Sequence, residues 1–262
     1  MSWNAYRTMA YFRHRMMARN AHALHSPYLF QLYNEVIKDR EEPRTEDIER
    51  LRRDLMRDHR KIEVEQRTSR NHEALELKER RVCDVARRSS VPAEYGRLLM
   101  RLAEYTDADR VLELGTSIGL GTTYLARGSS GTVTTVDSCA FSLEVAKEGL
   151  KKTGLSDRIL VRHGKFDELL PSLMKVGEEW DIVVMDGEHN PHEVHDYFNQ
   201  ILPHLHKNSV VIIDDIYRSQ SMTAAWDELC RRPEVHQSID LFRFGLLFFR
   251  TQQLREHFRL RL

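Results

Sequence analysis

The sequence predicts an α/β fold in which helices cover both faces of a mostly parallel sheet. From residue 110 onward, short β-branched runs alternate with amphipathic segments, and each run ends in a glycine or an acid. The runs are RVLEL, GTVTTVD, ILVRHG, WDIVVMD and SVVIIDD. Strand and helix segments that alternate in this way form a doubly wound parallel sheet. The final stretch, QSIDLFRFGLLFFR, predicts two adjacent strands, so we expect seven strands with an antiparallel hairpin at one edge.

The N-terminal region is predicted to be a helical extension, because charges are dense and mixed there and glycine occurs only at position 96. One segment, TEDIERLRRDLMRDHRKIEVEQ, carries apolar residues at helical spacing. A second helix is expected in VPAEYGRLLMRLAEYT, with Ser90 as N-cap and Pro92 in the first turn. The expected organisation is an extension over 1–105, a sheet domain over 106–252 and a C-terminal tail over 253–262.

Composition and charge exclude several classes of protein. With 262 residues and 41% hydrophobic content, the chain can bury a full core. Forty Lys and Arg residues balance forty Asp and Glu residues, so net charge does not favour nucleic acid or an acidic partner. Three cysteines without metal or disulfide spacing favour a reducing compartment. Since no apolar run is long enough for a membrane span or a signal peptide, we expect a cytoplasmic protein.

The first strand leads into a glycine-rich turn, in the stretch VLELGTSIGLGTTYLA. Ligands of doubly wound sheets bind at the carboxyl ends of the strands, so this turn is where a cofactor would lie. Glycines stand at positions 115, 119 and 121. This is not the G-x-G-x-x-G spacing of a dinucleotide fingerprint, which disfavours a nicotinamide dehydrogenase.

ELGTSIGLGT resembles motif I of the class I S-adenosylmethionine-dependent methyltransferases, in the E-x-G-x-x-x-G-x-(S/T) form common among small-molecule O-methyltransferases. The resemblance implies a Rossmann-like fold and S-adenosylmethionine as cofactor. It assigns the cofactor contacts of this turn to Glu113, Gly115, Thr116, Gly119, Gly121 and Thr122. A tight turn without a ligand is the structural alternative.

The second and third strands supply the remaining expected cofactor contacts. Asp137 ends the second strand, 22 residues after Gly115, where an acid can accept hydrogen bonds from both ribose hydroxyls. A strand-ending Asp can also cap the next helix, and both roles are compatible. The small Ser138 leaves room for adenosine. Gly164 and Phe166 flank a lysine where many family members have an acid for adenine, so we expect adenine recognition through backbone groups and Phe166.

The acceptor side is expected at the ends of the fourth and fifth strands. Asp186, Asp214 and Asp215 resemble the acids of cation-dependent O-methyltransferases, and oxygen ligands suit Mg²⁺ or another divalent cation. Such an ion would lower the pKa of an acceptor hydroxyl. His189 stands where those enzymes have a lysine, and it could act as a general base without a metal, with Asp186 beside it as a catalytic acid group. The alternative is structural, with the two acids holding strand-end amides and His189 packed beneath a loop.

Residues 1–34 contain four arginines, no acids and many aromatic residues, and they include HALHSP. We predict a helical lid over the cofactor and the acceptor, since small-molecule methyltransferases carry N-terminal helices for that purpose. Contact with nucleic-acid bases or with a membrane surface stays open. The H-x-x-H-S-P element from His22 to Pro27 resembles one found ahead of this core in uncharacterised bacterial proteins, where it is either a turn or a substrate contact.

Together these features predict a methyltransferase that O-methylates a small-molecule hydroxyl. The alternatives are an RNA-directed methyltransferase that uses the basic aromatic arm and a non-catalytic protein that keeps the fold. Nucleic acid is disfavoured as a partner because the N/D-P-P-Y type signature of base methylation is absent from the sequence. The acceptor, the need for a metal and the oligomeric state stay open, with a homodimer sealed by the helical arm as one option.

Overall fold

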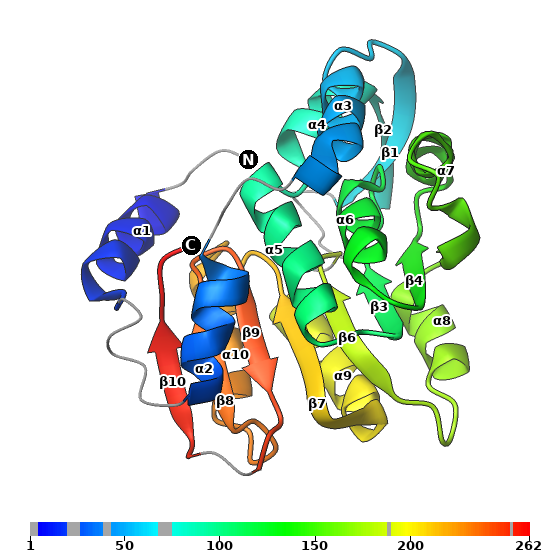
Figure 1. The fold of residues 1–262 in the computed structure, drawn as a ribbon. Coiled ribbons are helices and arrows are strands. Elements are labelled where there is room, and N and C mark those ends of the chain that lie inside the picture. The colour runs from blue at the N-terminus through cyan, green and yellow to red at the C-terminus, as the bar shows by residue number, and fades with distance from the viewer. Residues whose placement is uncertain (1–4, 20–26, 39–42, 68–74, 188–189, 252–253) are drawn as a thin grey trace.

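The fold was obtained as a computed structural model that describes residues 5–19, 27–38, 43–67, 75–187, 190–251 and 254–262. Its centre is an eight-stranded sheet with the strand order β10-β8-β9-β7-β6-β3-β4-β5 (Figure 1). The strands are β3 (Arg110–Leu114), β4 (Thr132–Asp137), β5 (Ile159–His163), β6 (Trp180–Met185), β7 (Leu205–Ile213), β8 (Gln237–Asp240), β9 (Gly245–Phe248) and β10 (Glu256–Arg259). This confirms the predicted doubly wound α/β class, with one strand more than expected.

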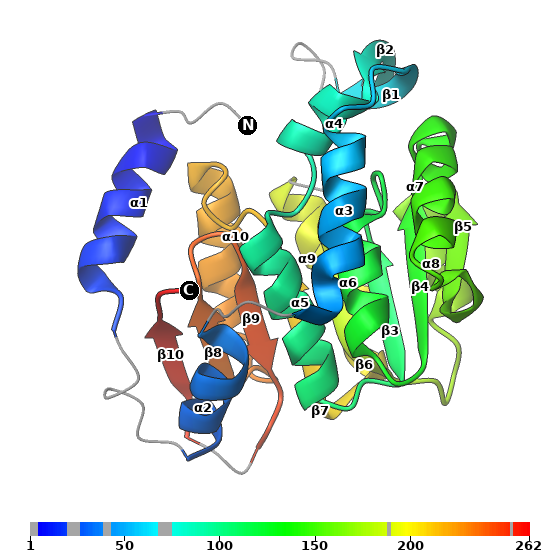
Figure 2. The same cartoon turned by 45° about the horizontal axis from the view of Figure 1, so that its top comes forward.

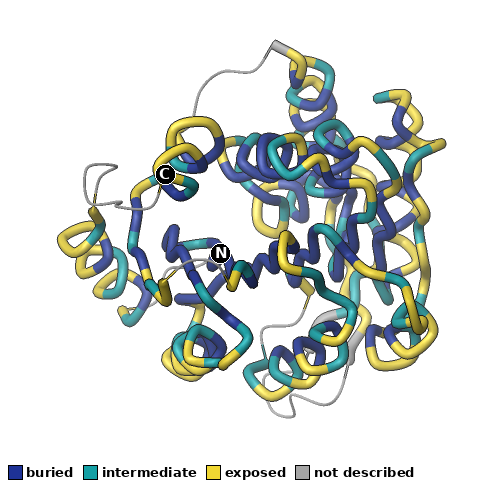
Figure 3. The backbone as a smooth tube through the Cα atoms, turned by 60° about the horizontal axis from the view of Figure 1, so that its bottom comes forward, coloured by how far each residue is buried: buried dark blue, intermediate teal, exposed yellow. Residues whose placement is uncertain are grey.

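Helices cover both faces of the sheet, because inward side chains alternate along each strand between two apolar clusters. One face packs on α5 (Ala93–Tyr105), α6 (Leu120–Gly128) and α7 (Ala140–Lys152), with α2 (Pro27–Leu32) and α3 (Glu46–Leu55) beside them. The other packs on α8 (Phe166–Leu173), α9 (Pro191–Ile201) and α10 (Gln220–Cys230). Figure 2 shows α5 and α6 on one side of the sheet and α9 and α10 on the other. The inner strands β3, β6, β8 and β9 are accordingly almost fully buried, and Figure 3 shows buried backbone through the centre of the fold.

Short elements complete the chain between these helices and strands. They are the π-helix η2 (Tyr33–Ile37) and the 3-10 helices η3 (Pro43–Thr45), η4 (Ser156–Arg158) and η5 (Leu202–His204), together with α4 (Val82–Arg88). Among the described residues, no helix is both long and apolar enough to cross a membrane.

The N-terminal region differs from the all-helical expectation. A separate antiparallel hairpin of β1 (Lys61–Arg67) and β2 (Leu75–Arg81) follows α3. Its first strand, KIEVEQR, alternates apolar and polar residues, and Ile62 and Val64 pack against the core. This two-residue period is a strand signal that the helical pattern before Leu55 had obscured. The following helix also begins later than expected, since Pro92 occupies the N-cap of α5 and Ser90 does not cap it.

The C-terminal residues join the sheet, although a tail was expected there. β10 pairs in parallel with β8 and forms the edge, so the antiparallel β8–β9 hairpin lies inside the sheet. β9 pairs antiparallel with β7 and aligns Gly245 with Ile213. The turn between β8 and β9 therefore lies at the carboxyl end of β7.

The N-terminal helix α1 (Ala5–Met17) packs against this same part of the molecule. The Tyr6 hydroxyl donates to Thr223 of α10 at 2.8 Å, and the Tyr11 ring meets Phe242 edge-on at 5.1 Å between centroids. Beyond α1, Arg19 bridges to Leu260 next to β10. The first helix and the last strand of the chain thus lie side by side (Figure 1).

Candidate functional site

The turn after β3 lies near the middle of the carboxyl edge of the sheet, and its glycines present backbone without side chains there. Gly115 has a φ of +112°, and an added Cβ would lie 2.8 Å from the backbone of Asp186 and Gly187. Gly119 has a φ of +82° and forms the N-cap of α6. Both positions require glycine, because other residues rarely adopt this conformation. The turn can therefore come close to a ligand.

Glu113 is buried beneath this turn and supports it through hydrogen bonds. It is 3% exposed, and its Oε2 accepts hydrogen bonds from the hydroxyls of Thr122 and Thr135. Burial raises the pKa of Glu113 to about 7, although the two hydroxyls lower it. Its other oxygen faces Gly121, where a Cβ would lie only 2.7 Å away. This acid, predicted to contact the cofactor, is thus held in place by hydrogen bonds within the protein.

Asp137 closes the turn from the next strand. Its carboxylate accepts hydrogen bonds from the backbone N–H groups of Ser117 at 2.7 Å and Cys139 at 2.9 Å. Desolvation raises the pKa of this carboxyl, and the two N–H groups oppose that rise. The N-cap of α7 is Cys139, which has no side-chain capping bond, so Asp137 does not cap this helix as the alternative expected, and its bond from Cys139 N–H lies in the turn before the helix. The bond to Ser117 joins β4 to the glycine turn.

A narrow cleft runs along the glycine turn. Its lining includes Ser90, Glu113, Gly115, Thr116, Gly121 and Asp186. Ser90 Oγ is buried and has no hydrogen-bond partner within the described part of the chain. A buried polar atom without a partner is rare in folded proteins and suits a site that a polar ligand completes. Together with the glycine turn and Asp137, these residues fit S-adenosylmethionine.

The expected adenosine contacts are more scattered. Ser138 Oγ donates to Glu65 of the β1–β2 hairpin at 2.6 Å, so the hairpin reaches the end of β4. Gly164, with a φ of +152°, donates its N–H to the carbonyl of Asp137. Phe166 is buried: it packs against Gly187 and meets the Tyr197 ring edge-on. The structure thus puts Phe166 in the core below the turn, and it brings Glu65, which the sequence analysis did not single out, beside Ser138.

On the acceptor side, two arginines meet the predicted acids. Arg243, from the turn between β8 and β9, donates from Nε and Nη2 to the two carboxylate oxygens of Asp214 at 2.8 and 2.9 Å. Arg7 of α1 donates to Asp215 at 2.9 Å. In both pairs the acid side chain is fully buried and the arginine is 10–11% exposed. Bidentate and charge-assisted bonds of this kind are the strong ones in proteins.

Asp186 directly follows β6 and faces Asp214. Burial, followed by the charge of Asp214 and a hydrogen bond with it, raises the pKa of Asp186 well above its usual range. The raised pKa favours the protonated form of Asp186, which suits the hydrogen bond between the two carboxyl groups.

The predicted metal triad does not fit a divalent cation. Mg²⁺ and Ca²⁺ need free oxygen ligands at about 2.0–2.6 Å. Both oxygens of Asp214 and one of Asp215 are taken by guanidinium groups, and Asp186 is engaged with Asp214. No group of three or more His, Cys, Asp or Glu side chains in the described ranges could hold a metal ion.

Aromatic and ionic contacts attach α1 beside these acids. His14 is 3.1 Å from the carboxylate of Asp240, and its ring lies 5.6 Å from that of Phe242. Phe242 stacks on Tyr217, whose hydroxyl donates to Asp240 at 2.6 Å.

The predicted base His189 lies outside the described residues. So do His22, His25 and Ser26 of the H-x-x-H-S-P element. No sequence pattern predicted that Arg7 or Arg243 belongs to the site, since each lies far from its partner along the chain.

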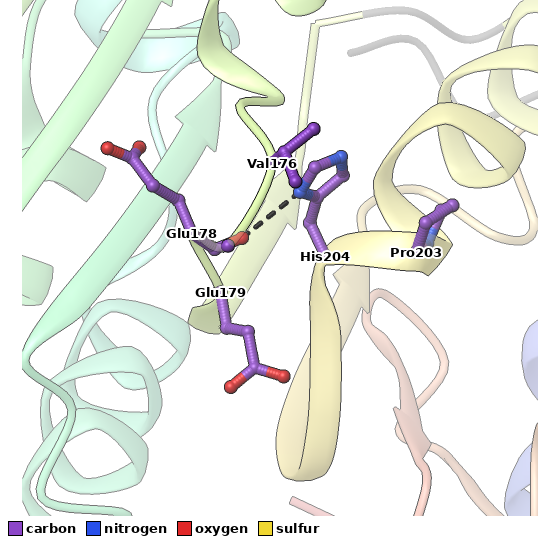
Figure 4. A pocket seen from close by; sticks show the side chains of 6 residues that line it. Val176, Glu178, Glu179, Pro203 and His204 are labelled. Carbon is purple, nitrogen blue, oxygen red and sulfur yellow. Dashed lines mark hydrogen bonds between the residues drawn. The ribbon is translucent and has the colours of Figure 1, made fainter.

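A larger hollow of about 340 Å³ lies away from this site (Figure 4). It is formed by the loop before β6 and by η5, where His204 Nδ1 meets the carbonyl of Glu178 at 3.0 Å. Val176, Glu179 and Pro203 complete its lining. Because β6 and β7 begin here, the hollow lies at the amino ends of the strands, opposite the edge that binds ligands in such sheets.

Comparisons with known proteins agree with this geometry. A family model described as a methyltransferase domain matches residues 112–216. The catechol O-methyltransferase of Mycobacterium tuberculosis is 32% identical over 143 residues, which are 54% of this chain and 63% of that protein. The catechol O-methyltransferase of Niastella koreensis is 28% identical over 132 residues, 49% of this chain and 59% of that protein. The chain thus spans about 60% of the length of these curated relatives.

A solved structure shares the fold. The O-methyltransferase of tomaymycin synthesis from Streptomyces achromogenes, in complex with S-adenosylmethionine, is 20% identical with a TM-score of 0.58. The match covers 84% of this chain and 95% of that one. The doubly wound sheet and its surrounding helices are therefore common to both.

Proposed function

We propose that the chain is a class I methyltransferase of the O-methyltransferase type, and that it transfers a methyl group from S-adenosylmethionine to a hydroxyl of a small molecule. The observation that carries this proposal is the turn at Gly115, whose bare backbone stands between two acids, Glu113 and Asp137, at the carboxyl edge of the sheet. The names of the relatives direct the first acceptor screen to catechols.

In this proposal, the residues of the turn bind and orient the cofactor. When bound, S-adenosylmethionine would supply an electrophilic methyl group to the acceptor oxygen, and the electron pair of the carbon–sulfur bond would stay on sulfur. The carboxylate of Asp137 would exchange its bond to the Ser117 N–H for bonds from the ribose hydroxyls. Ser90 Oγ and the Gly115 turn would contact the rest of the cofactor. This holds the reacting atoms in line, which is itself a large part of the rate enhancement in two-substrate reactions.

The acceptor hydroxyl must lose its proton, and His189 is the proposed general base. It follows Asp186 by three residues and precedes the helix start at Pro191. Imidazole accepts protons near neutral pH, whereas Asp186 is engaged in a hydrogen bond with Asp214. The RNA-directed alternative draws less support from the arm than its composition suggested, because Arg7 is buried against Asp215.

Calorimetric binding of S-adenosylmethionine and S-adenosylhomocysteine to the full chain tests the proposal. We expect micromolar binding that Asp137→Ala weakens at least about tenfold, a loss of roughly 1.4 kcal/mol or more. Asp157→Ala, which removes an exposed acid from η4, is the matched control and should bind like wild type. If neither ligand binds the wild-type chain, methyl transfer is wrong and the fold serves another role.

A further inference from the structure

The arginines at the acceptor side suggest how its acidic residues are used. We propose that Arg243 and Arg7 supply the positive charge of this cluster. The site then works without a divalent cation, although its three aspartates resemble a binding site for one. The inference rests on the proposed methyl-transfer function, because it concerns how the acceptor side of that site is built. It assigns to Arg243 a positioning role, since Arg243 acts through Asp214 on Asp186 at the cleft.

Arg243 is fixed in place by the sheet. The turn that carries it joins β8 to β9, and the pairing of Gly245 with Ile213 aligns this turn with the end of β7, directly before Asp214. Both guanidinium bonds to Asp214 are short, and the pair is almost fully buried. A guanidinium stays protonated at any pH the folded protein meets. Its charge is therefore permanent, as that of a bound cation would be.

Arg7 neutralises the neighbouring acid from the other end of the chain. It lies 208 positions before Asp215, and both side chains of the pair are buried. Asp215 has a φ of +52°, a conformation that non-glycine residues rarely adopt. The backbone thus turns this acid away from the course of β7, and α1 brings the matching charge.

The cluster holds its own positive charges without a metal. Asp214 faces the guanidinium of Arg243, and Asp215 faces that of Arg7 at 2.9 Å and that of the half-exposed Arg218 at 3.7 Å, while Asp186 shares a hydrogen bond with Asp214. A divalent cation would have to replace the bidentate bonds of Arg243 and leave a buried guanidinium without its counter-charge. Removing one partner of a buried pair is strongly unfavourable, because the charge that remains is desolvated. The aspartates are therefore charge-paired without a metal, although Asp215 Oδ2 accepts no hydrogen bond from the described residues.

The test measures metal binding and stability beside cofactor binding. Free Mn²⁺ is followed by electron paramagnetic resonance during titration with the full chain. Melting temperatures are recorded in Mg²⁺ and in chelator. The variants are Arg243→Met, which keeps the length of the side chain without its charge, Arg243→Lys, and the control Arg218→Met. Arg218 is 45% exposed and lies 3.7 Å from Asp215. Arg218→Met is therefore the same substitution made at the exposed rim of the same cluster.

We expect the wild-type chain to leave Mn²⁺ free and to melt at the same temperature in Mg²⁺ and in chelator. Arg243→Met should melt on the order of 5–10 °C lower in chelator. Mg²⁺ should restore part of this loss, because it can replace the positive charge that Asp214 loses with Arg243. Arg243→Lys should keep most of the stability, and Arg218→Met should behave like wild type.

Two results would overturn the inference. One is binding of about one Mn²⁺ per wild-type chain that chelator reverses. The other is an Arg243→Met variant that matches Arg218→Met in both melting temperature and Mn²⁺ binding. If Arg243→Met does not fold, the wild-type titration decides alone. Calorimetry of S-adenosylmethionine on the same samples separates the two questions, since failure to bind the cofactor refutes the proposed function whatever the ion results.

Discussion

The proposed cofactor side and the proposed acceptor side of this site are built in different ways. The cofactor side is made from one continuous stretch of chain, where β3, its glycine turn, α6 and β4 follow one another and most contacts involve backbone. The acceptor side is made from side chains of α1, the end of β7 and the β8–β9 turn, joined by buried ion pairs. The first depends on the absence of side chains, the second on long side chains that meet across the fold. Substitutions should therefore affect the two sides separately.

The largest effect is expected from Gly115→Ala on the cofactor side. The methyl group would meet the backbone of Asp186 at 2.8 Å, in a φ of +112° that alanine rarely adopts. We expect a loss of about 4 kcal/mol of stability and of measurable S-adenosylmethionine binding. Denaturant unfolding and calorimetry provide the two readouts.

The matched control for this substitution is Gly154→Ala. Gly154 also has a positive φ, +67°, but nothing lies within 4 Å of its added Cβ. It should lose about 1 kcal/mol and keep full cofactor affinity. Equal losses in the two variants would mean that the close approach of Gly115 to Asp186 has no importance of its own.

A smaller, pH-dependent effect is expected from Glu113→Gln. Since burial raises the pKa of Glu113 to about 7 from 4.5, the folded protein binds more protons than the unfolded chain between these values. The free energy of unfolding of wild type should therefore fall as pH rises through this window, by on the order of 3 kcal/mol. Gln cannot ionise and still accepts bonds from Thr122 and Thr135, so the variant should gain stability over wild type at pH 8 and show no gain at pH 4.

Urea unfolding of the ligand-free protein at several pH values measures this difference. Glu144→Gln, an exposed position of α7, serves as the control and should follow wild type at every pH. Parallel pH profiles for Glu113→Gln and wild type would show that Glu113 ionises as easily in the folded protein as in the unfolded chain.

The smallest effect is expected from His14→Leu on the acceptor side. The change removes one partner of the buried Asp240, which keeps its bonds from Tyr217 and Arg259. A loss of about 1–3 kcal/mol follows, with faster tryptic cleavage within α1 and unchanged cofactor affinity. Arg13→Leu, at an exposed position of the same helix, is the control. If His14→Leu also lost cofactor affinity, the two sides of the site would not be independent of each other.

The same difference explains what the sequence could and could not predict. The parallel strands, the turn at Gly115 and the position of Asp137 follow from local patterns, and the α/β class is confirmed. The β1–β2 hairpin was missed because KIEVEQR follows directly on a helical repeat, and β10 because a four-residue edge strand has too few residues for a period. The partners Arg243 and Arg7 could not be predicted, because an ion pair between distant segments leaves no spacing in the sequence.

The contacts of α1 also impose an order on folding. Arg7 and His14 leave the ribosome early, whereas their partners Asp215 and Asp240 lie 208 and 226 positions later. The helix α1 therefore stays undocked through most of synthesis and docks only after the last third of the sheet has formed. Contacts of such wide sequence separation form late because the chain between them must first be ordered. A chain that stops before Asp240 would hold a complete glycine turn and an N-terminal helix with no place to dock.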